Sequence, residues 1–450
     1  MNVEVRTSLD DDALATHIER VADASARWIS DELERRAPRR APLAADEERL
    51  IAVQAAHREL AAITRERIDR GAGPLSDAVE AHIVSAVIDL HYGLGGLQPY
   101  VDDPDVENIN VNGYDCVWVT WSGGRRERVG PVASSDAALT EVVKRAARRL
   151  GLGERRWDTT EPILNLQLSD GTRLHAVLGG DAQRGLSPRP LVSLRRHRYR
   201  DLDLDDLVNL GSLNRSAAAF LRQLVGGHLN LMVAGPPNSG KTTNLRALCN
   251  AIPAHERIVT VEQDLLELGL HRDEARHPDC VALYSRQANS EDEGEITVAQ
   301  LVRATLRMSP TRVIVGEVLG DEVIPMLNAM SSGTFGSLST IHAHSSESVF
   351  SRLASYALQA PERLTPTATY RLVAEAIDFV VFANIEDDGR GPKRKISSIR
   401  EVVGLGDDGY VTSTEVWALD TAGELAPRAP MSARHLVRLR AAGFDPTGSL

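Results

Sequence analysis

The sequence is poor in cysteine and has no long apolar run. Its three cysteines, Cys116, Cys249 and Cys280, lie far apart in a chain of 450 residues and form no CxxC pair. This argues against a disulfide framework and a structural zinc site, and it is typical of reduced thiols in the cytosol. No stretch approaches the roughly 18 to 20 apolar residues that a membrane helix needs. The N-terminal run MNVEVRTSLDDDALATHIERV has no apolar signal region, so we expect a cytoplasmic protein without an anchor of its own.

An excess of positive charge is also missing. The 51 basic and 63 acidic side chains give a net charge of -12. This balance disfavours a general binder of nucleic acid or anionic membranes, although it leaves room for a local basic patch. The apolar fraction of 42% and the charged fraction of 25% are those of an ordinary globular protein. A chain of this length predicts two or three domains.

The first ninety residues have apolar positions at helical spacing. They predict helices at 10–37, 46–69 and 75–90. Pro38 and Pro42 separate the first two helices, because proline cannot lie inside a helix.

From residue 93 the pattern changes to short alternating runs, such as VENINVNG, CVWVTW, RLHAVL and LVSLRR. Runs of this kind indicate strands, and one helix is expected between them at 137–150. Past Leu213, helices and buried strands alternate, which predicts a parallel sheet with helices on both faces. Thr297 and Gln300 form a capping box at the start of one of these helices.

We therefore predict four parts. They are a helical N-terminal module (1–90), an α+β domain (91–205), an α/β domain that ends in further strands (206–420) and a C-terminal tail (421–450).

A phosphate-binding loop is predicted at AGPPNSGKTTNL, which follows a buried strand and opens a helix expected to run to Ile252. Glycines at both ends of the loop let successive N–H groups point at phosphate oxygens, and the helix N-terminus adds partial positive charge. Lys241 supplies a charge to the β- and γ-phosphates, and the Thr242 hydroxyl is placed to ligate Mg2+. The predicted nucleotide-binding residues are Gly235, Pro236, Pro237, Asn238, Ser239, Gly240, Lys241, Thr242 and Thr243.

Acidic residues stand at the ends of two predicted strands. In VIVGEV, Gly316 occupies the first position of the usual acid pair and Glu317 the second. A carboxylate there can orient and deprotonate the attacking water. In TVEQDLLEL, one of Glu262, Asp264 and Glu267 could hold Mg2+ through water, although acidic loop residues without a ligand are also common.

His342 ends a further strand in STIHAH. An imidazole there could sense the γ-phosphate or have only a structural role. Arg173 and the run RRHRYR at 195–200 precede the α/β domain. Three interpretations of this run stay open: a nucleic-acid patch, a source of arginine fingers, or a solvated face, which residue type alone favours.

Taken in order, several blocks resemble the CpaF/TadA-type ATPases of tight-adherence (Flp) pilus assembly, in the type II/type IV secretion ATPase superfamily. The blocks include GLGGLQPYVDDPDVENINVNG, DGTRLHAV, SLRRHR, GPPNSGKTTNLRAL, LVRATLRMSPTRVIVGEV and GSLSTIHAHS. The resemblance covers roughly residues 90–419. It implies an N-terminal domain hinged to a RecA-like P-loop NTPase domain. The predicted fold is therefore α/β with a RecA-like core, preceded by the α+β domain and by the helical module that periodicity predicts. It also implies a homo-hexameric ring under an inner-membrane platform.

The resemblance also implies roles for individual residues. Glu317 would be the catalytic base, Glu262 would hold metal in the acidic box, and His342 would form the histidine box, with ATP and Mg2+ bound at the phosphate loop. Arg173 and Arg195 match arginines that reach the γ-phosphate.

Three departures accompany the resemblance. Gln263 stands where the acidic box usually has aspartate, Leu319 where an arginine is common, and His344 where an asparagine is common.

Three functions are weighed. An ATP-hydrolysing motor for pilus assembly or protein secretion is favoured by the intact Lys241, Glu317 and His342. A hydrolysis-poor nucleotide-binding scaffold is favoured by the altered acidic box and Leu319. A conjugation-type DNA-transfer ATPase would use the arginine-rich run, but the acidic balance disfavours it. We expect the motor, attached peripherally to the cytoplasmic membrane through platform partners and without stable nucleic-acid binding.

Overall fold

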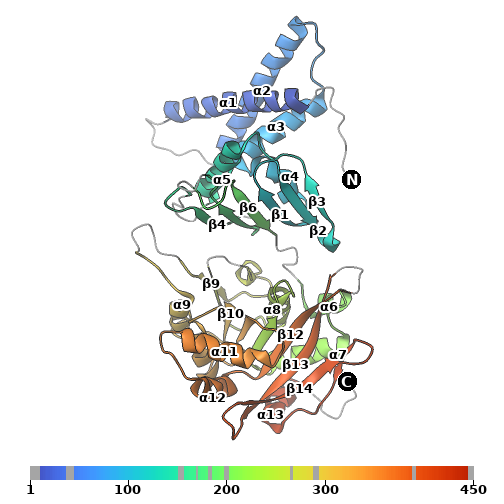
Figure 1. Cartoon of the computed structure of the whole chain (residues 1–450), viewed down its shortest axis with the longest axis vertical. Helices are drawn as coiled ribbons and strands as arrows, with labels where there is room; N and C mark the ends of the chain where they lie inside the picture. The colour runs from blue at the N-terminus through green and yellow to red at the C-terminus, as the bar shows by residue number, and fades with distance from the viewer. Residues whose placement is uncertain are drawn as a thin grey trace. The chain divides into compact units, whose positions relative to one another are not determined.

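The computed structural model describes residues 11–36, 45–150, 157–168, 171–180, 185–196, 202–263, 267–286, 293–387 and 392–443. The chain divides into two compact units, residues 1–198 and 199–450, which are described separately (Figure 1). The predictions that involve Pro38, Pro42, Asp264 and residues 197–200 lie outside the described residues.

Three helices begin the first unit, close to the predicted ranges. Their apolar faces meet in one buried cluster that includes Val21, Leu60 and Ile83. An ion pair adds to this packing, because Arg20 bonds Glu59 and Glu66 across the first two helices. The helices are α1 (Asp11–Arg36), α2 (Ala45–Asp69) and α3 (Asp77–Tyr92).

The described strands of the first unit form an antiparallel sheet of six strands in the order β3-β2-β1-β6-β5-β4. Alternate residues, such as Leu174 and Leu194, lie in a core that also contains Leu139 and Val143 of α5 (Asp136–Leu150). The strands are β1 (Val106–Asn112), β2 (Val117–Trp121), β3 (Arg126–Val129), β4 (Ile163–Gln167), β5 (Arg173–Val177) and β6 (Leu191–Arg195).

Two strands of this sheet, β3 and β4, were not predicted. Both are edge strands, which pair on one side only. Three of the four residues of β3 are exposed, so its sequence lacks the apolar alternation by which a half-buried strand is recognised.

The second unit is built on a nine-stranded sheet in the order β15-β14-β13-β12-β7-β11-β10-β8-β9. The six strands from β12 to β9 are parallel, and β13 to β15 continue the sheet antiparallel. This confirms the predicted parallel sheet for β7, β8, β10 and β11, and it adds β9 and β12, of which only β12 was predicted as a strand. The strands are β7 (Leu231–Gly235), β8 (Ile258–Glu262), β9 (Cys280–Tyr284), β10 (Arg312–Val318), β11 (Leu338–His342), β12 (Phe379–Asp387), β13 (Pro392–Leu405), β14 (Val411–Leu419) and β15 (Leu425–Pro427).

Helices cover both faces of this sheet, which confirms the predicted α/β class with a RecA-like core. One buried cluster joins the sheet to α6, α7, α8 and α13, and a second joins it to α9, α10, α11 and α12. The helices are α6 (Leu204–Asn209), α7 (Arg215–Gly226), α8 (Lys241–Cys249), α9 (Val298–Thr305), α10 (Val323–Ser331), α11 (Ser348–Gln359), α12 (Pro366–Ala376) and α13 (Ala433–Ala441).

Two details of helix boundaries were tested by the structure. The capping box of Thr297 and Gln300 is present at the start of α9. The prediction that the helix after the phosphate loop reaches Ile252 is wrong, because α8 ends at Cys249 and Asn250 caps it. The edge strands β9 and β15 were not predicted either.

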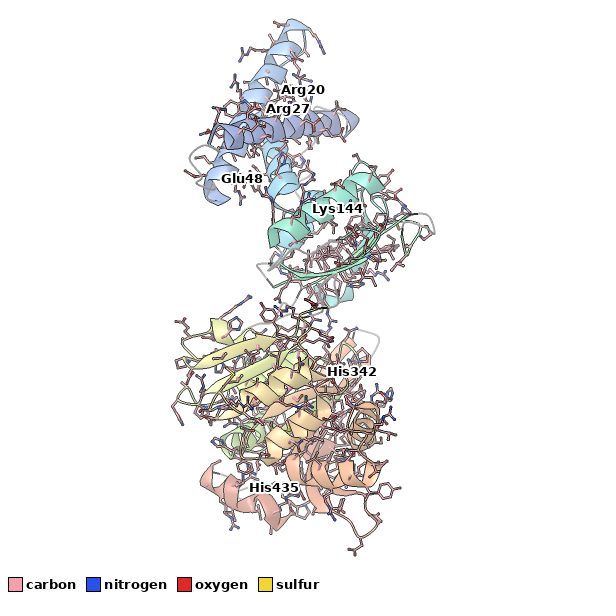
Figure 2. All side chains as sticks on the ribbon, turned by 90° about the vertical axis from the view of Figure 1, so that its left-hand side faces the viewer. Arg20, Arg27, Glu48, Lys144, His342 and His435 are labelled. Atoms are coloured by element: carbon pink, nitrogen blue, oxygen red, sulfur yellow. The ribbon has the colours of Figure 1, made fainter. Side chains whose placement is uncertain are left out.

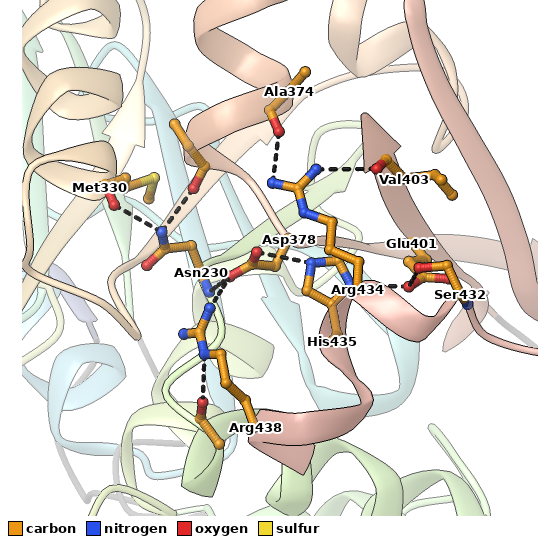
Figure 3. Close-up of polar contacts among 12 residues, drawn as sticks. Asn230, Met330, Ala374, Asp378, Glu401, Val403, Ser432, Arg434, His435 and Arg438 are labelled. Atoms are coloured by element: carbon orange, nitrogen blue, oxygen red, sulfur yellow. Dashed lines mark hydrogen bonds and ion pairs between the residues drawn. The ribbon is translucent and has the colours of Figure 1, made fainter. Parts of the chain in front are cut away.

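A buried polar cluster fastens α13 to the sheet (Figure 3). His435 Nδ1 lies 2.8 Å from a carboxylate oxygen of Glu401, and Nε2 lies 3.0 Å from one of Asp378. The other oxygen of Asp378 accepts hydrogen bonds from the backbone N–H of Asn230 and from Arg438. An imidazole that bonds a carboxylate through each nitrogen must donate from both, which requires the charged ring.

We predict that this cluster makes folding depend on pH. Burial alone would lower the pKa of His435, but the hydrogen bonds to Asp378 and Glu401 raise it above the ordinary 6.5. A raised pKa in the folded state gives stability that is complete below pH 6.5 and is lost as pH rises through the folded value. We therefore expect the difference in free energy of unfolding between wild type and His435→Gln to become smaller as pH increases. Denaturation of both proteins at several values from pH 6 to pH 9 measures it. A constant difference would contradict the charged ring.

Candidate functional site

The phosphate loop lies between β7, whose five residues are all buried, and the start of α8. Asn238 and Gly240 have positive φ angles of 63° and 85°, the left-handed conformation that turns backbone N–H groups to the inside of such a loop. At Gly235 a Cβ atom would lie 2.2 Å from the Ala383 carbonyl oxygen of β12, so only glycine fits. The local backbone is thus that of a phosphate cradle.

Three predicted residues from three elements meet beside this loop. Lys241 Nζ lies 3.1 Å from His342 Nδ1, and His342 Nε2 lies 3.0 Å from Glu317 Oε1. Lys241 also donates to the Pro236 carbonyl at 3.2 Å. They meet because the parallel strands β7, β10 and β11 end at the same edge of the sheet, where His342 is in register with Gly235.

His342 is held in its neutral form. Its pKa is lowered, first by burial and then by the positive charge of Lys241, while Glu317 acts in the opposite direction. A lysine ammonium can only donate, so Nδ1 accepts its hydrogen bond and Nε2–H donates to Glu317. The result is a polar chain from the loop lysine to the strand-end carboxylate.

More than half of the sequence matches a known protein family. Residues 94–383 match the family described as "Type II/IV secretion system protein". This chain belongs to that family.

Among the relatives, "Putative conjugal transfer protein Rv3659c" of Mycobacterium tuberculosis is 35% identical over 335 residues, which cover 73% of this chain and 89% of that protein. "Protein VirB11" of Agrobacterium fabrum is 30% identical, over 63% of this chain and 86% of its own length. The crystal structure of the VirB11 ATPase from the Brucella suis type IV secretion system, in complex with sulphate, is 27% identical. It covers 69% of this chain and 97% of its own, with a TM-score of 0.36.

In this secretion-family chain the missing acid of the usual pair has a steric explanation. A Cβ at Gly316 would lie 3.1 Å from Glu262 Cγ, on the neighbouring strand β8. A larger residue there would push Glu262 aside. One oxygen of Glu262 accepts the backbone N–H groups of Glu267 at 2.6 Å and Leu268 at 2.9 Å, which sets the direction of the carboxylate.

The two predicted metal ligands, Thr242 and Glu262, both offer oxygen atoms. The Thr242 hydroxyl lies in the first turn of α8 and the Glu262 carboxylate ends β8, and oxygen atoms are the ligands that Mg2+ prefers. The role of both residues stays a prediction.

Arg173 and Arg195 are brought together by the sheet of the first unit. They stand directly opposite each other on β5 and β6. Their neighbours Leu174 and Leu194 are buried, so the two arginines lie on the face away from the core. The next residue of the basic run, Arg196, bonds the Asp103 carbonyl at 2.7 Å. The phosphate loop belongs to the second unit, and the finger role of the pair stays a prediction.

One residue at the loop was not predicted. Arg394 of β13 donates from Nε to the Asn238 carbonyl at 2.9 Å. The only signal in the sequence is the basic run KRK at 393–395, which has no spacing that links it to a phosphate loop 156 residues earlier.

Proposed function

We propose that this chain is an ATP-hydrolysing motor that drives pilus assembly or protein secretion at the inner face of the cytoplasmic membrane. The observation that supports it best is the polar chain from Lys241 through His342 to Glu317 beside a phosphate loop. The sequence blocks that resemble CpaF-type ATPases favour pilus assembly as the pathway.

In this proposal each residue has a distinct task. Lys241 binds the β- and γ-phosphates. Glu317 takes a proton from the attacking water, so that the new P–O bond forms as the bond to the ADP oxygen breaks. His342, neutral and bonded to both, keeps the carboxylate in place. Mg2+, when bound, would neutralise phosphate charge, with Thr242 and Glu262 as its predicted ligands.

The ring and the partners are part of the same proposal. Six copies would assemble with platform proteins of the membrane, and the arginine pair would complete the site by binding the γ-phosphate. Membrane attachment would come through those partners. None of the helices in the described ranges is long and apolar enough to cross a membrane.

Removing Arg195 tests the role of the pair. In Arg195→Ala we expect turnover to fall about tenfold, the scale of one hydrogen bond to a charged group, because Arg173 remains opposite it. ADP affinity should hardly change, since ADP lacks the γ-phosphate. Steady-state hydrolysis and ADP titration measure the two quantities. Arg128→Ala, an exposed arginine on the edge strand of the same sheet, is the control. Equal losses of ADP and ATP binding would leave Arg195 a general phosphate contact.

A second candidate is a conjugation-type DNA-transfer ATPase, favoured by the name of the mycobacterial relative. The net charge of -12 predicts only weak, salt-sensitive DNA binding. Sub-micromolar affinity for single- or double-stranded DNA near physiological salt would favour this candidate over the secretion motor.

A further inference from the structure

Strands β12 and β13 contact the phosphate loop near its first and its last residues. On β12, the Ala383 carbonyl closes on Gly235, where a Cβ would lie 2.2 Å away. On β13, Arg394 bonds the Asn238 carbonyl at 2.9 Å, and its Cδ lies 3.5 Å from the place of a Cβ on Gly240. Both strands follow the other five parallel strands in the chain, and their contacts are independent of the loop's own sequence.

The register of these two strands explains why Arg394 lies on this side. Arg394 is opposite Ile385, and Ile396 is opposite Ala383. Alternate residues share a face of a sheet, and Ile396 is buried in the cluster that contains Leu245 of α8. Arg394 is therefore one step further along the face that α8 covers, beside the start of that helix.

The guanidinium of Arg394 has donors to spare. A guanidinium carries five N–H groups. Within the described part of the chain, the Nε–H bond to Asn238 is the one hydrogen bond that the Arg394 side chain makes, and the residue is exposed. The bond fixes the guanidinium beside the loop and leaves its two terminal nitrogens available to a ligand. A planar fork of donors of this kind matches the geometry of phosphate oxygens.

We propose that Arg394 is a further phosphate-binding residue of this site, whose terminal nitrogens bind the phosphates that ADP and ATP share. The inference rests on the nucleotide binding proposed above. Lys241 serves the β- and γ-phosphates, whereas the loop backbone cradles the α- and β-phosphates. Arg394 lies against the backbone of Asn238 and Gly240. The second cation of the site thus comes from the C-terminal strands.

The test is a titration of the full chain with ADP and with a non-hydrolysable ATP analogue, at low and at raised salt. In Arg394→Gln we expect the affinity for both to fall about tenfold, as for the loss of a charged hydrogen bond, and the salt dependence to become weaker. Arg394→Lys, which keeps the charge, should recover most of the affinity.

Lys395→Gln is the matched control. It removes the same charge one residue away, on the opposite face of β13, where Lys395 pairs with Glu386 at 3.3 Å. Its nucleotide affinity should stay within twofold of wild type. An equal loss in this variant would reduce Arg394 to part of a general positive field. Arg394→Gln could instead lose affinity while keeping the salt dependence of wild type, with no recovery in Arg394→Lys. Arg394 would then have only a structural role, to hold the loop backbone through its bond to Asn238.

The outcomes separate this inference from the function on which it rests. If wild type binds both nucleotides and Arg394→Gln binds them equally well, Arg394 is not a phosphate ligand, and the proposed motor is unaffected. If wild type binds neither nucleotide, the proposed function itself fails.

Discussion

Glu317→Gln should keep ATP binding and lower turnover by about 100-fold or more, the usual scale for the loss of a general base. Glutamine has nearly the same shape and can still hydrogen-bond His342, but it cannot accept a proton from water. The carboxylate it replaces lies 3.0 Å from His342 Nε2, at the end of a polar chain that starts at the loop lysine. The loss should therefore fall on the chemical step and leave binding intact.

Two measurements check this result. Steady-state phosphate release gives turnover, and titration with an ATP analogue gives affinity. Lys241→Ala is the contrasting variant, because it removes the charge on the phosphates and should weaken nucleotide binding itself. Unchanged turnover in Glu317→Gln would remove Glu317 from the chemistry and would favour another group as the base.

Arg312→Ala should destabilise the second unit by about 3–5 kcal/mol, the range for breaking a buried ion pair from one side. Arg312 is fully buried at the start of β10, and its guanidinium donates hydrogen bonds to both carboxylate oxygens of Glu256 at 2.6 and 2.8 Å. Two further N–H groups bond the carbonyls of Gly336 and Val225. Without the arginine, the buried carboxylate of Glu256 would lose both of these bonds and keep the longer contact with His228 Nε2 at 3.5 Å, and this loss is the main cost.

Denaturant unfolding of the full chain, with the transition of the second unit followed separately, measures this effect. Arg303→Ala is the control, because its pair with Glu362 is of similar length, 2.9 Å, but largely exposed. That pair should contribute below about 1 kcal/mol. In Arg312→Met combined with Glu256→Leu, both charges are gone and much of the loss should be recovered. A loss in Arg312→Ala no larger than in the control would contradict the buried-pair interpretation.

His342 and His435 show that residue type alone does not predict the direction in which a histidine pKa is shifted. Both are strand- or helix-borne histidines of the second unit, and both are labelled in Figure 2. His342 has a lowered pKa beside Lys241, whereas the two carboxylates around His435 raise its pKa. Nothing in the sequence near His435 distinguishes it, because Asp378 and Glu401 approach it from 57 and 34 residues away.

The sequence by itself determined the α/β class, the alternation of helices and strands, and the phosphate loop with its strand and helix. These depend on local spacing: apolar periodicity, glycine positions and a capping box act over a few residues. It also placed Lys241, Glu317 and His342 at element ends, where parallel strands bring side chains to one edge.

The tertiary structure decided which of these residues touch, because strand order and register join segments that no local pattern connects. Lys241 and His342 are 101 residues apart, and their contact depends on β7 and β11 being neighbours. Arg173 and Arg195 face each other only because β5 pairs with β6 in that register. Arg394 reaches the loop because β13 returns antiparallel along β12. Short edge strands such as β3 were decided in the same way, since backbone pairing with a neighbour replaces the apolar signal that their sequences lack.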